Sequence, residues 1–402
     1  MVSRAPWLTI VGIGEDGVEG LTQAARAAIS RAVCVIGGER HLALARSLIS
    51  GERIPWPSPL AEAIPAILAR RGSPVAVLAS GDPFCFGVGS LLARQLPIAE
   101  MLCLPAPSAF SLACARLGWA LSEVDTISFC GRPLEAIRPL LQPGARVLAL
   151  SADHTTPAAL AALLARWGFG ETRITVLEAM GGSNEDRFTF RALSKIHDTI
   201  AQLNLMALEV VGSPAVPLTP GLDEDWFETD GQITKQEIRA LTLAALAPLR
   251  GQRLWDVGAG SGSVGIEWML RHPSCRTIAI EARADRAARV AHNATALGVP
   301  ALEVRAGSAP EALADLASPD AVFIGGGAAN RSITDICWSA LPTGGRLVIN
   351  AVTLETERAV MALHAAWGGR LTRIGIERLE PIGSMQGFAP ARTVLQYRAV
   401  KQ

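Results

Sequence analysis

Residues 254–267 read LWDVGAGSGSVGIE, an apolar run that leads into a glycine-rich turn and then a helical pattern. Two interpretations compete. Gly260, Gly262 and Gly265 have the spacing G-x-G-x-x-G of a dinucleotide-binding turn. Asp256 followed by Gly258, Gly260 and Gly262 reads D-x-G-x-G-x-G instead. Both interpretations require a strand, a tight turn and a helix, so the stretch predicts an α/β fold but leaves the ligand open.

Charge separates the two interpretations. A pyrophosphate lies over such a turn and the N-terminus of the following helix, where N–H groups and the helix dipole attract it. A carboxylate at Asp256 opposes a phosphate and suits a ligand with an ammonium and a sulfonium, such as S-adenosylmethionine. The glycines then permit close approach of the ligand to the backbone. Glu281 ends the next strand pattern, RTIAIE, where an acid can accept hydrogen bonds from both ribose hydroxyls.

The pattern continues on both sides of this turn. Upstream, ITKQEIRAL predicts a helix with a capping box, in which Thr234 is the N-cap and Glu237 lies three residues on. Downstream, EVRAGSAPEAL places Gly307, Ser308 and Ala309 after a third strand, where an adenine could rest. FIGGG and RLVINAV add further strands, so the region predicts a parallel sheet covered by helices. The missing Asn/Asp-Pro-Pro-aromatic element weighs against methylation of nucleic-acid bases.

Residues 212–232, GSPAVPLTPGLDEDWFETDGQ, are rich in proline, glycine and acid and have no helical or strand period. Residues 1–212 before them also alternate strand and helix patterns, and LPAPS at 104–108 predicts a hinge inside that half. We therefore expect a first domain over 1–212 with subdomains of about 1–105 and 106–212. A linker over 213–231 and a second domain over 232–402 follow.

Bulk composition excludes several classes of protein. The net charge is zero and the pI about 7.0, which argues against a nucleic-acid partner. No apolar run reaches the roughly 18 residues of a membrane span, and the N-terminus has no signal-peptide pattern. The seven cysteines and six histidines are scattered, without metal-ligand spacing. We expect a cytoplasmic, reduced protein that binds no metal.

Several strings of the C-terminal half together resemble the class I methyltransferase domain of cobalamin biosynthesis that methylates and decarboxylates a corrin precursor. These strings are TKQEIR, DVGAGSGSVGIE, AIEA, GSAPEAL, PDAVFIGGG and GGRLVINAVTLE, between residues 234 and 355. The resemblance implies a Rossmann-like fold and an S-adenosylmethionine site. The site residues so expected are Thr234, Asp256, Gly258, Ala259, Gly260, Ser261, Gly262, Glu281, Gly307, Ser308 and Ala309.

The N-terminal half is similar to the tetrapyrrole methylase family. The similarity rests on VGIGEDG at 11–17, ASGDPFCFGVGS at 79–90 and PAPSAFSLACARLG at 105–118. It implies two α/β subdomains with S-adenosylmethionine between them, held by Gly12, Gly14, Ser80, Gly81, Asp82, Cys85, Ser108, Ala109 and Met180. The chain departs from the family at GIGEDG, commonly G-x-G-P-G, at Ser80, often glycine, and at Ala106–Pro107, usually Pro-Gly.

Together the two resemblances imply a bifunctional enzyme with two S-adenosylmethionine sites. It methylates two meso carbons, C5 and C15, of a small-molecule tetrapyrrole and removes the carboxyl of the ring C acetate. The N-terminal half is expected to act at C5, and the C-terminal half at C15 and in decarboxylation. Family resemblance also implies a homo-oligomer, and Arg40, Arg132 and Arg239 are candidate partners of substrate carboxylates.

No pattern identifies a catalytic residue. Two alternatives remain at this stage. One is an NAD(P)-dependent oxidoreductase with two Rossmann domains, which Asp256 and the Glu15–Asp16 pair in the first glycine loop disfavour. The other is a non-catalytic or RNA-directed protein that binds a methyl donor, which the near-neutral pI opposes.

Overall fold

The computed structural model describes residues 6–57, 59, 62–196 and 199–402, and these form two compact units. Within the described residues, the first unit runs to residue 134 and from 142 to 214, and the second comprises 135–141 and 215–402. Residues 1–5, part of the segment in which no signal peptide is expected, lie outside the described residues. Among the residues described, no helix is long and apolar enough to cross a membrane.

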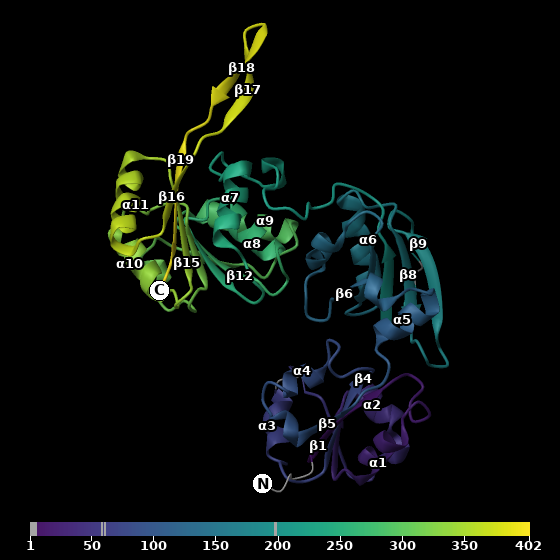
Figure 1. Ribbon diagram of the computed structural model, residues 1–402. Coiled ribbons are helices and arrows are strands. Elements are labelled where there is room, and N and C mark those ends of the chain that lie inside the picture. The colour runs from purple at the N-terminus through teal and green to yellow at the C-terminus, as the bar shows by residue number, and fades with distance from the viewer. Residues whose placement is uncertain (1–5, 58, 60–61, 197–198) are drawn as a thin grey trace. The chain divides into compact units, whose positions relative to one another are not determined.

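The first unit begins with a parallel sheet in the order β3-β2-β4-β1-β5, with α1 and α2 on one face and α3 and α4 on the other (Figure 1). Ile10 and Val77 face α3, whereas Val11 packs in the cluster beneath α1, so both faces of the central strands are buried. The elements are β1 (Leu8–Ile13), α1 (Gln23–Arg31), β2 (Cys34–Gly37), α2 (Glu39–Leu44), β3 (Glu52–Pro55), α3 (Ala63–Leu68), β4 (Val75–Ser80), α4 (Val88–Leu92) and β5 (Met101–Leu104).

A second, mixed sheet completes the first unit, in the order β6-β7-β10-β8-β9. β6 and β7 are parallel and the other neighbours antiparallel. Phe110 and Cys114 of α5 pack against this sheet, in contact with β7 and β10. The elements are α5 (Ala109–Leu117), β6 (Asp125–Ser128), β7 (Arg146–Leu150), α6 (Thr156–Arg166), β8 (Arg173–Glu178), β9 (Asp186–Arg191) and β10 (Asn204–Glu209).

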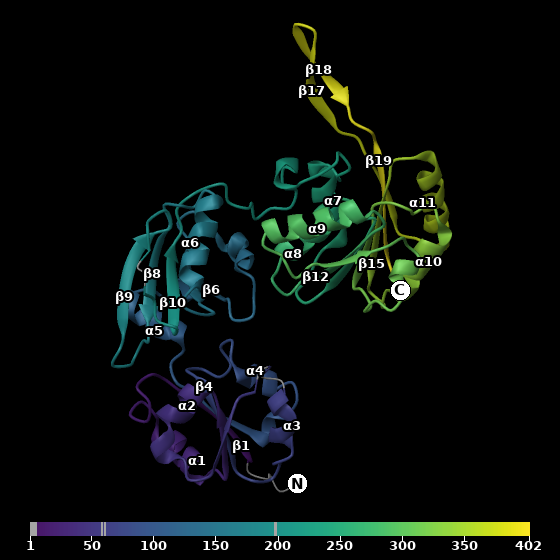
Figure 2. The ribbon, with the colours of Figure 1, turned by 180° about the vertical axis from the view of Figure 1, so that it is seen from behind.

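The second unit is built on a sheet in the order β13-β12-β11-β14-β15-β19-β16, in which β11 to β15 are parallel and β19 is antiparallel. Helices α7, α8 and α9 cover one face and α10 and α11 the other (Figures 1 and 2). The strand order reverses between β11 and β14, which makes the carboxyl ends of these strands the expected binding edge of the sheet.

The elements of the second unit, in chain order, are α7 (Gln236–Leu246), β11 (Arg253–Val257), α8 (Ser263–Leu270), β12 (Arg276–Glu281), α9 (Ala284–Ala296), β13 (Glu303–Ala306), β14 (Ala321–Ile324), α10 (Arg331–Ala340), β15 (Arg346–Ala351), α11 (Leu354–Trp367), β16 (Arg370–Ile374), β17 (Glu377–Ile382), β18 (Met385–Pro390) and β19 (Val394–Val400). Short 3₁₀ helices in the chain are η1 (Arg46–Leu48), η3 (Ile98–Glu100), η4 (Leu121–Glu123), η5 (Leu134–Leu140), η6 (Glu224–Trp226) and η7 (Glu311–Leu313).

Strands β17 and β18 form a two-stranded hairpin that extends away from the rest of the second unit (Figures 1 and 2). Its large apolar side chains are solvent-exposed: Leu379 by 54%, Ile382 by 62%, Met385 by 72% and Phe388 by 71%. Leu379 and Phe388 face each other across the ladder. A two-stranded hairpin in water is marginally stable, so this apolar surface is a candidate for burial against a partner.

The segment predicted as a linker packs on the second unit. Val216, Leu222 and Phe227 of this segment are buried in the core of the second unit. These apolar residues lie among the prolines and acids on which the linker prediction rested. The contact boundary therefore falls between residues 214 and 215.

Thr22 is the N-cap of α1, since its side-chain oxygen accepts the N–H of Ala25. The capping box at Thr234 is wrong. Lys235 is the N-cap residue of α7, and a carboxylate oxygen of Glu224 accepts the N–H of Gln236 at 3.2 Å instead. Glu237 does not reach back to the cap, because its carboxylate pairs with Arg378.

Candidate functional site

The first unit contains a cavity of about 360 Å³ lined by residues of both its sheets. That volume lies in the range of small-molecule sites. Its walls come from the ends of β1 and β4, the start of α5 and the segment after β8. The residues predicted for the first cofactor site that line the cavity are Gly14, Ser80, Gly81, Asp82, Cys85, Ser108, Ala109 and Met180. The structure thus brings together segments far apart in the sequence.

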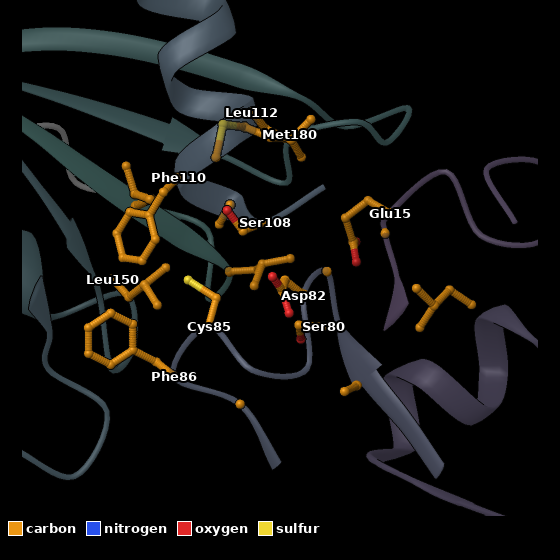
Figure 3. A pocket seen from close by; sticks show the side chains of 18 of the residues that line it. Glu15, Ser80, Asp82, Cys85, Phe86, Ser108, Phe110, Leu112, Leu150 and Met180 are labelled. Atoms are coloured by element: carbon orange, nitrogen blue, oxygen red, sulfur yellow. The ribbon is translucent and has the colours of Figure 1, made fainter. Parts of the chain in front are cut away.

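The cavity has a polar end and an apolar end. Figure 3 shows Glu15, Ser80 and Asp82 on one side and Phe86, Phe110 and Leu150 on the other. This division suits a ligand with a charged part and an apolar or flat part. Two non-glycine residues of the lining, Phe86 and Ala179, have φ of +55° and +42°. Such strained backbone is found preferentially at ligand sites.

Gly12 does not line the cavity but supports it from beneath. A Cβ at this position would lie 1.8 Å from the carbonyl oxygen of Gly81 and 2.6 Å from the amide nitrogen of Ala106. Only glycine therefore permits the three loops to meet at this point. Direct contact of Gly12 with a ligand stays a prediction.

A charged network at the polar end was only partly anticipated. The Arg40 guanidinium pairs with Glu15 and donates to Ser80 Oγ at 3.0 Å and to His41 Nε2 at 2.9 Å. Arginine can only donate, so Nε2 is the acceptor in its contact with Arg40. Burial, and then the charge of Arg40, lower the pKa of His41 to about 4. His41 is therefore neutral at pH 7, and the charge of Glu15 is offset by Arg40.

Sequence reasoning named Arg40 as a partner of substrate carboxylates but missed His41. The available signal was position: both residues follow the glycine pair at the end of β2, whose carboxyl end lies at the same edge of the parallel sheet as those of β1 and β4. Arg132, the second candidate, lies 5.2 Å over the ring of Phe86, which lines the cavity.

In the second unit, the predicted residues gather at the carboxyl ends of neighbouring strands. The glycine turn follows β11, Glu281 ends β12, and Gly307 to Ala309 follow β13. The N–H groups of Gly258 and Ala259 both donate to the carbonyl of Ile280, which joins the turn to the next strand. Gly258, Gly260 and Gly262 have φ of +74°, +62° and +78°, in the left-handed region that favours glycine.

Asp256 differs from its expected role. It is fully buried, and its Oδ2 accepts the N–H of Gly265 in α8 at 3.0 Å. Burial, opposed by that hydrogen bond and assisted by the charge of Glu281, raises the pKa of Asp256 to about 7. Its carboxylate supports the turn from inside the protein, so Asp256 shapes the turn. That its charge favours a cationic ligand stays a prediction.

Glu281 is 5% exposed and holds the turn directly. One carboxylate oxygen accepts the N–H of Gly260 at 2.8 Å and the other accepts the N–H of Arg283 at 3.0 Å. Each carboxylate oxygen has a second lone pair, so Glu281 keeps the capacity to accept a hydrogen bond from a ribose hydroxyl.

Two buried polar atoms at the turn have no partner among the described residues: Ser261 Oγ and Asp256 Oδ1. Buried polar groups are nearly always hydrogen-bonded, so unsatisfied atoms at a glycine turn indicate a missing polar ligand or water. Thr234, the remaining predicted residue, precedes α7, and its carbonyl accepts a hydrogen bond from Arg239. These features fit an adenosyl cofactor bound over Gly258–Gly262.

The prediction that Arg239 binds a substrate carboxylate is wrong. Its side chain is fully buried, pairs with Glu267 and donates to the carbonyls of Thr234 and Leu222. It also lies 4.8 Å over the ring of Phe227. A guanidinium committed in this way cannot reach a substrate carboxylate, because burial of its charge depends on these partners.

Comparison with known proteins matches both units. Residues 7–194 match the tetrapyrrole (corrin/porphyrin) methylase family, and residues 225–401 match the precorrin methyltransferase domain. A Sinorhizobium sp protein named precorrin-6Y C(5,15)-methyltransferase (decarboxylating) is 53% identical over 400 residues, covering 99% of this chain and 97% of that protein.

Two further relatives have related names. A Mycobacterium tuberculosis protein with the same name is 39% identical and covers 98% of this chain and 100% of its own length. A shorter Salmonella typhimurium protein, named cobalt-precorrin-7 C(5)-methyltransferase, is 36% identical over 31% of this chain and 62% of its own length. The near-complete coverage by decarboxylating methyltransferases leaves the two-Rossmann oxidoreductase without support. The chain belongs to the precorrin-6Y C(5,15)-methyltransferase (decarboxylating) family.

Proposed function

We propose that this chain converts precorrin-6B to precorrin-8, with methylation at C5 and C15 and loss of the ring C acetate carboxyl as carbon dioxide. Each unit holds one S-adenosylmethionine, the first in the cavity beside Ser80 and Asp82 and the second over Gly258–Gly262. The reaction takes place in the cytoplasm. The observation that carries the proposal is the match of the whole chain, through both units, to decarboxylating methyltransferases.

We assign C5 methylation to the first unit and C15 methylation with decarboxylation to the second. The shorter relative named only for C5 methylation supports the idea that the two methylations are separable. The C-terminal strings that resemble a methylating and decarboxylating domain support the assignment of decarboxylation to the second unit.

The residues need to provide position more than strong acid–base chemistry. S-adenosylmethionine supplies an activated methyl group, and a meso carbon flanked by enamine nitrogens is already nucleophilic. The first cavity has an apolar wall of Phe86, Phe110 and Leu150, against which an apolar part of the substrate would displace water. Arg40, tied to Glu15 and Ser80 at the polar end of the cavity, presents a fixed guanidinium for a substrate carboxylate. Holding two reactants in line in this way accounts for a large part of a rate enhancement.

We further propose that the chain is a homo-oligomer and that the β17/β18 hairpin contributes to the contact. Its exposed Leu379, Ile382, Met385 and Phe388 form an apolar surface on a ribbon with little core of its own. Burial of that surface by a second copy would supply the packing that a two-stranded hairpin lacks.

The experiment is to incubate the full chain with precorrin-6B and S-adenosylmethionine and to measure the product's mass by mass spectrometry. We expect the gain of two methyl groups and the loss of one carbon dioxide. Gly12→Ala is expected to abolish one methylation and to leave carbon dioxide release intact. Loss of carbon dioxide release in Gly12→Ala, together with unchanged release in Glu281→Gln, would contradict the assignment of steps to units.

A further inference from the structure

Asn293, in the last turn of α9, joins the glycine turn to a segment that precedes α7. Its side chain is 2% exposed. The amide nitrogen donates to the carbonyl of Ser261 at 2.9 Å and to the carbonyl of Glu228 at 2.9 Å, and the amide oxygen accepts the N–H of Glu228 at 2.9 Å. Every polar atom of the asparagine is therefore used, with both donor hydrogens directed at backbone carbonyls.

The segment bonded to Asn293, which we call the strap, covers residues 221–234. Its first part is held by Glu267, whose carboxylate accepts the N–H groups of Gly221 and Leu222. Its last part is held by Arg239, which donates to Thr234. A Cβ on Gly260 would lie 3.2 Å from the carbonyl oxygen of Gln232, so the strap also touches the turn.

The turn itself is fixed by three side chains. Asp256 holds the N–H of Gly265, Glu281 holds the N–H of Gly260, and Asn293 holds the carbonyl of Ser261. Only Asn293 of these also bonds the strap. The Ser261 hydroxyl, buried and without a partner among the described residues, belongs to the same residue whose carbonyl Asn293 fixes.

We propose that Asn293 is a positioning residue of the second cofactor site, which orients Ser261 and the glycine turn for S-adenosylmethionine by anchoring them to the strap. This inference rests on the proposed function, because it takes the turn at 258–262 as a cofactor site. Asn293 acts through Ser261 and does not itself contact the ligand.

The test is calorimetric titration of the full chain with S-adenosylmethionine. In Asn293→Asp the side chain keeps its size, but a carboxylate oxygen replaces the amide nitrogen and faces two carbonyls. We expect one of the two dissociation constants to rise about tenfold, the scale of one lost buried hydrogen bond, and the other to stay unchanged. Asn293→Ala, which removes the side chain without adding charge, is expected to weaken the same site should the aspartate variant not fold.

Leu297→Ala is the matched control, since Leu297 is a buried core residue at the end of the same helix. It should lower the melting temperature without changing either dissociation constant. An equal rise of the dissociation constant in Leu297→Ala would show that the effect comes from general destabilisation, and would overturn the proposal. Two unchanged dissociation constants in both Asn293 variants would also overturn it. If the unmodified chain binds fewer than two equivalents, the two-site function fails first and the positioning role falls with it.

Discussion

The carboxylate of Glu281 accepts the amide N–H of Gly260 at 2.8 Å, across 21 positions of sequence. The end of β12 thereby fixes the glycine turn that follows β11. Replacement of Glu281 by glutamine puts an N–H₂ group where one acceptor oxygen stood. We expect Glu281→Gln to weaken S-adenosylmethionine binding at one site about tenfold and to leave the other site unchanged. Titration of the full chain measures both, and Glu303→Gln, on the neighbouring β13, serves as the control that should change neither.

Gly262 and Gly344 offer a matched pair of substitutions. Their φ angles are +78° and +80°, so alanine causes similar backbone strain at each. At Gly262 the added Cβ would also lie 2.8 Å from Val290, whereas at Gly344 it would meet nothing within 4 Å. Both variants should lose about 1–2 kcal/mol of unfolding free energy from backbone strain, Gly262→Ala more because of the contact with Val290. Only Gly262→Ala should also lose the methylation assigned to the second unit. Product mass and thermal unfolding measure the two effects, and equal activity of the variants would contradict the prediction.

Asp256 predicts a pH dependence of stability. Its folded pKa of about 7 lies above the ordinary aspartate value of 3.8, so the folded state binds this proton more tightly than the unfolded state. The contribution of protonated Asp256 to the unfolding free energy is therefore complete below pH 4. It falls as the pH rises to about 7, by up to about 1.4 kcal/mol per pH unit.

Asp256→Asn removes this titration, while its side-chain oxygen can still accept the N–H of Gly265. Denaturant titration at several pH values measures the unfolding free energy of both proteins. Between pH 4 and 7 we expect the original chain to lose unfolding free energy relative to the variant. A difference that does not change with pH would show that Asp256 titrates normally.

We expect Arg40 to affect only the methylation assigned to the first unit. Arg40→Gln leaves the carboxylate of Glu15 in the cavity without its cation, and removes the donor to Ser80. We expect kcat/KM for this step to fall on the order of tenfold, since a half-buried charge loses its partner. Arg53→Gln, an exposed arginine on β3, is the control. Separate quantification of singly and doubly methylated product distinguishes the steps.

The hairpin predicts an assembly contact. Leu379→Ser combined with Phe388→Ser removes the exposed cross-strand pair and leaves the core of the second unit untouched. We expect a smaller particle in light scattering after size exclusion, with an unchanged far-ultraviolet spectrum. An unaltered particle mass would exclude the hairpin from the contact.

Much of the second unit's fold was readable from residues 254–355. Strands such as RLWDV and RTIAIE alternate with helical segments, and left-handed glycines mark the turn, so local pattern and glycine conformation were sufficient to predict a parallel sheet with its binding edge. The same was true of β4, whose unbroken apolar run reflects burial on both faces.

Burial and partners were decided by the tertiary structure. Asp256 and Arg239 were predicted to face ligands, yet both are fully buried, because α8 supplies an N–H to one and Glu267 a carboxylate to the other. His41 and Asn293 were missed for the same reason: their partners lie 39 and 32 positions away, at Ser80 and Ser261. Sequence alone determined which backbone conformations were favourable and where polar side chains follow strands. Which of those side chains meet, and which lose their water, depends on long-range packing that no local pattern contains.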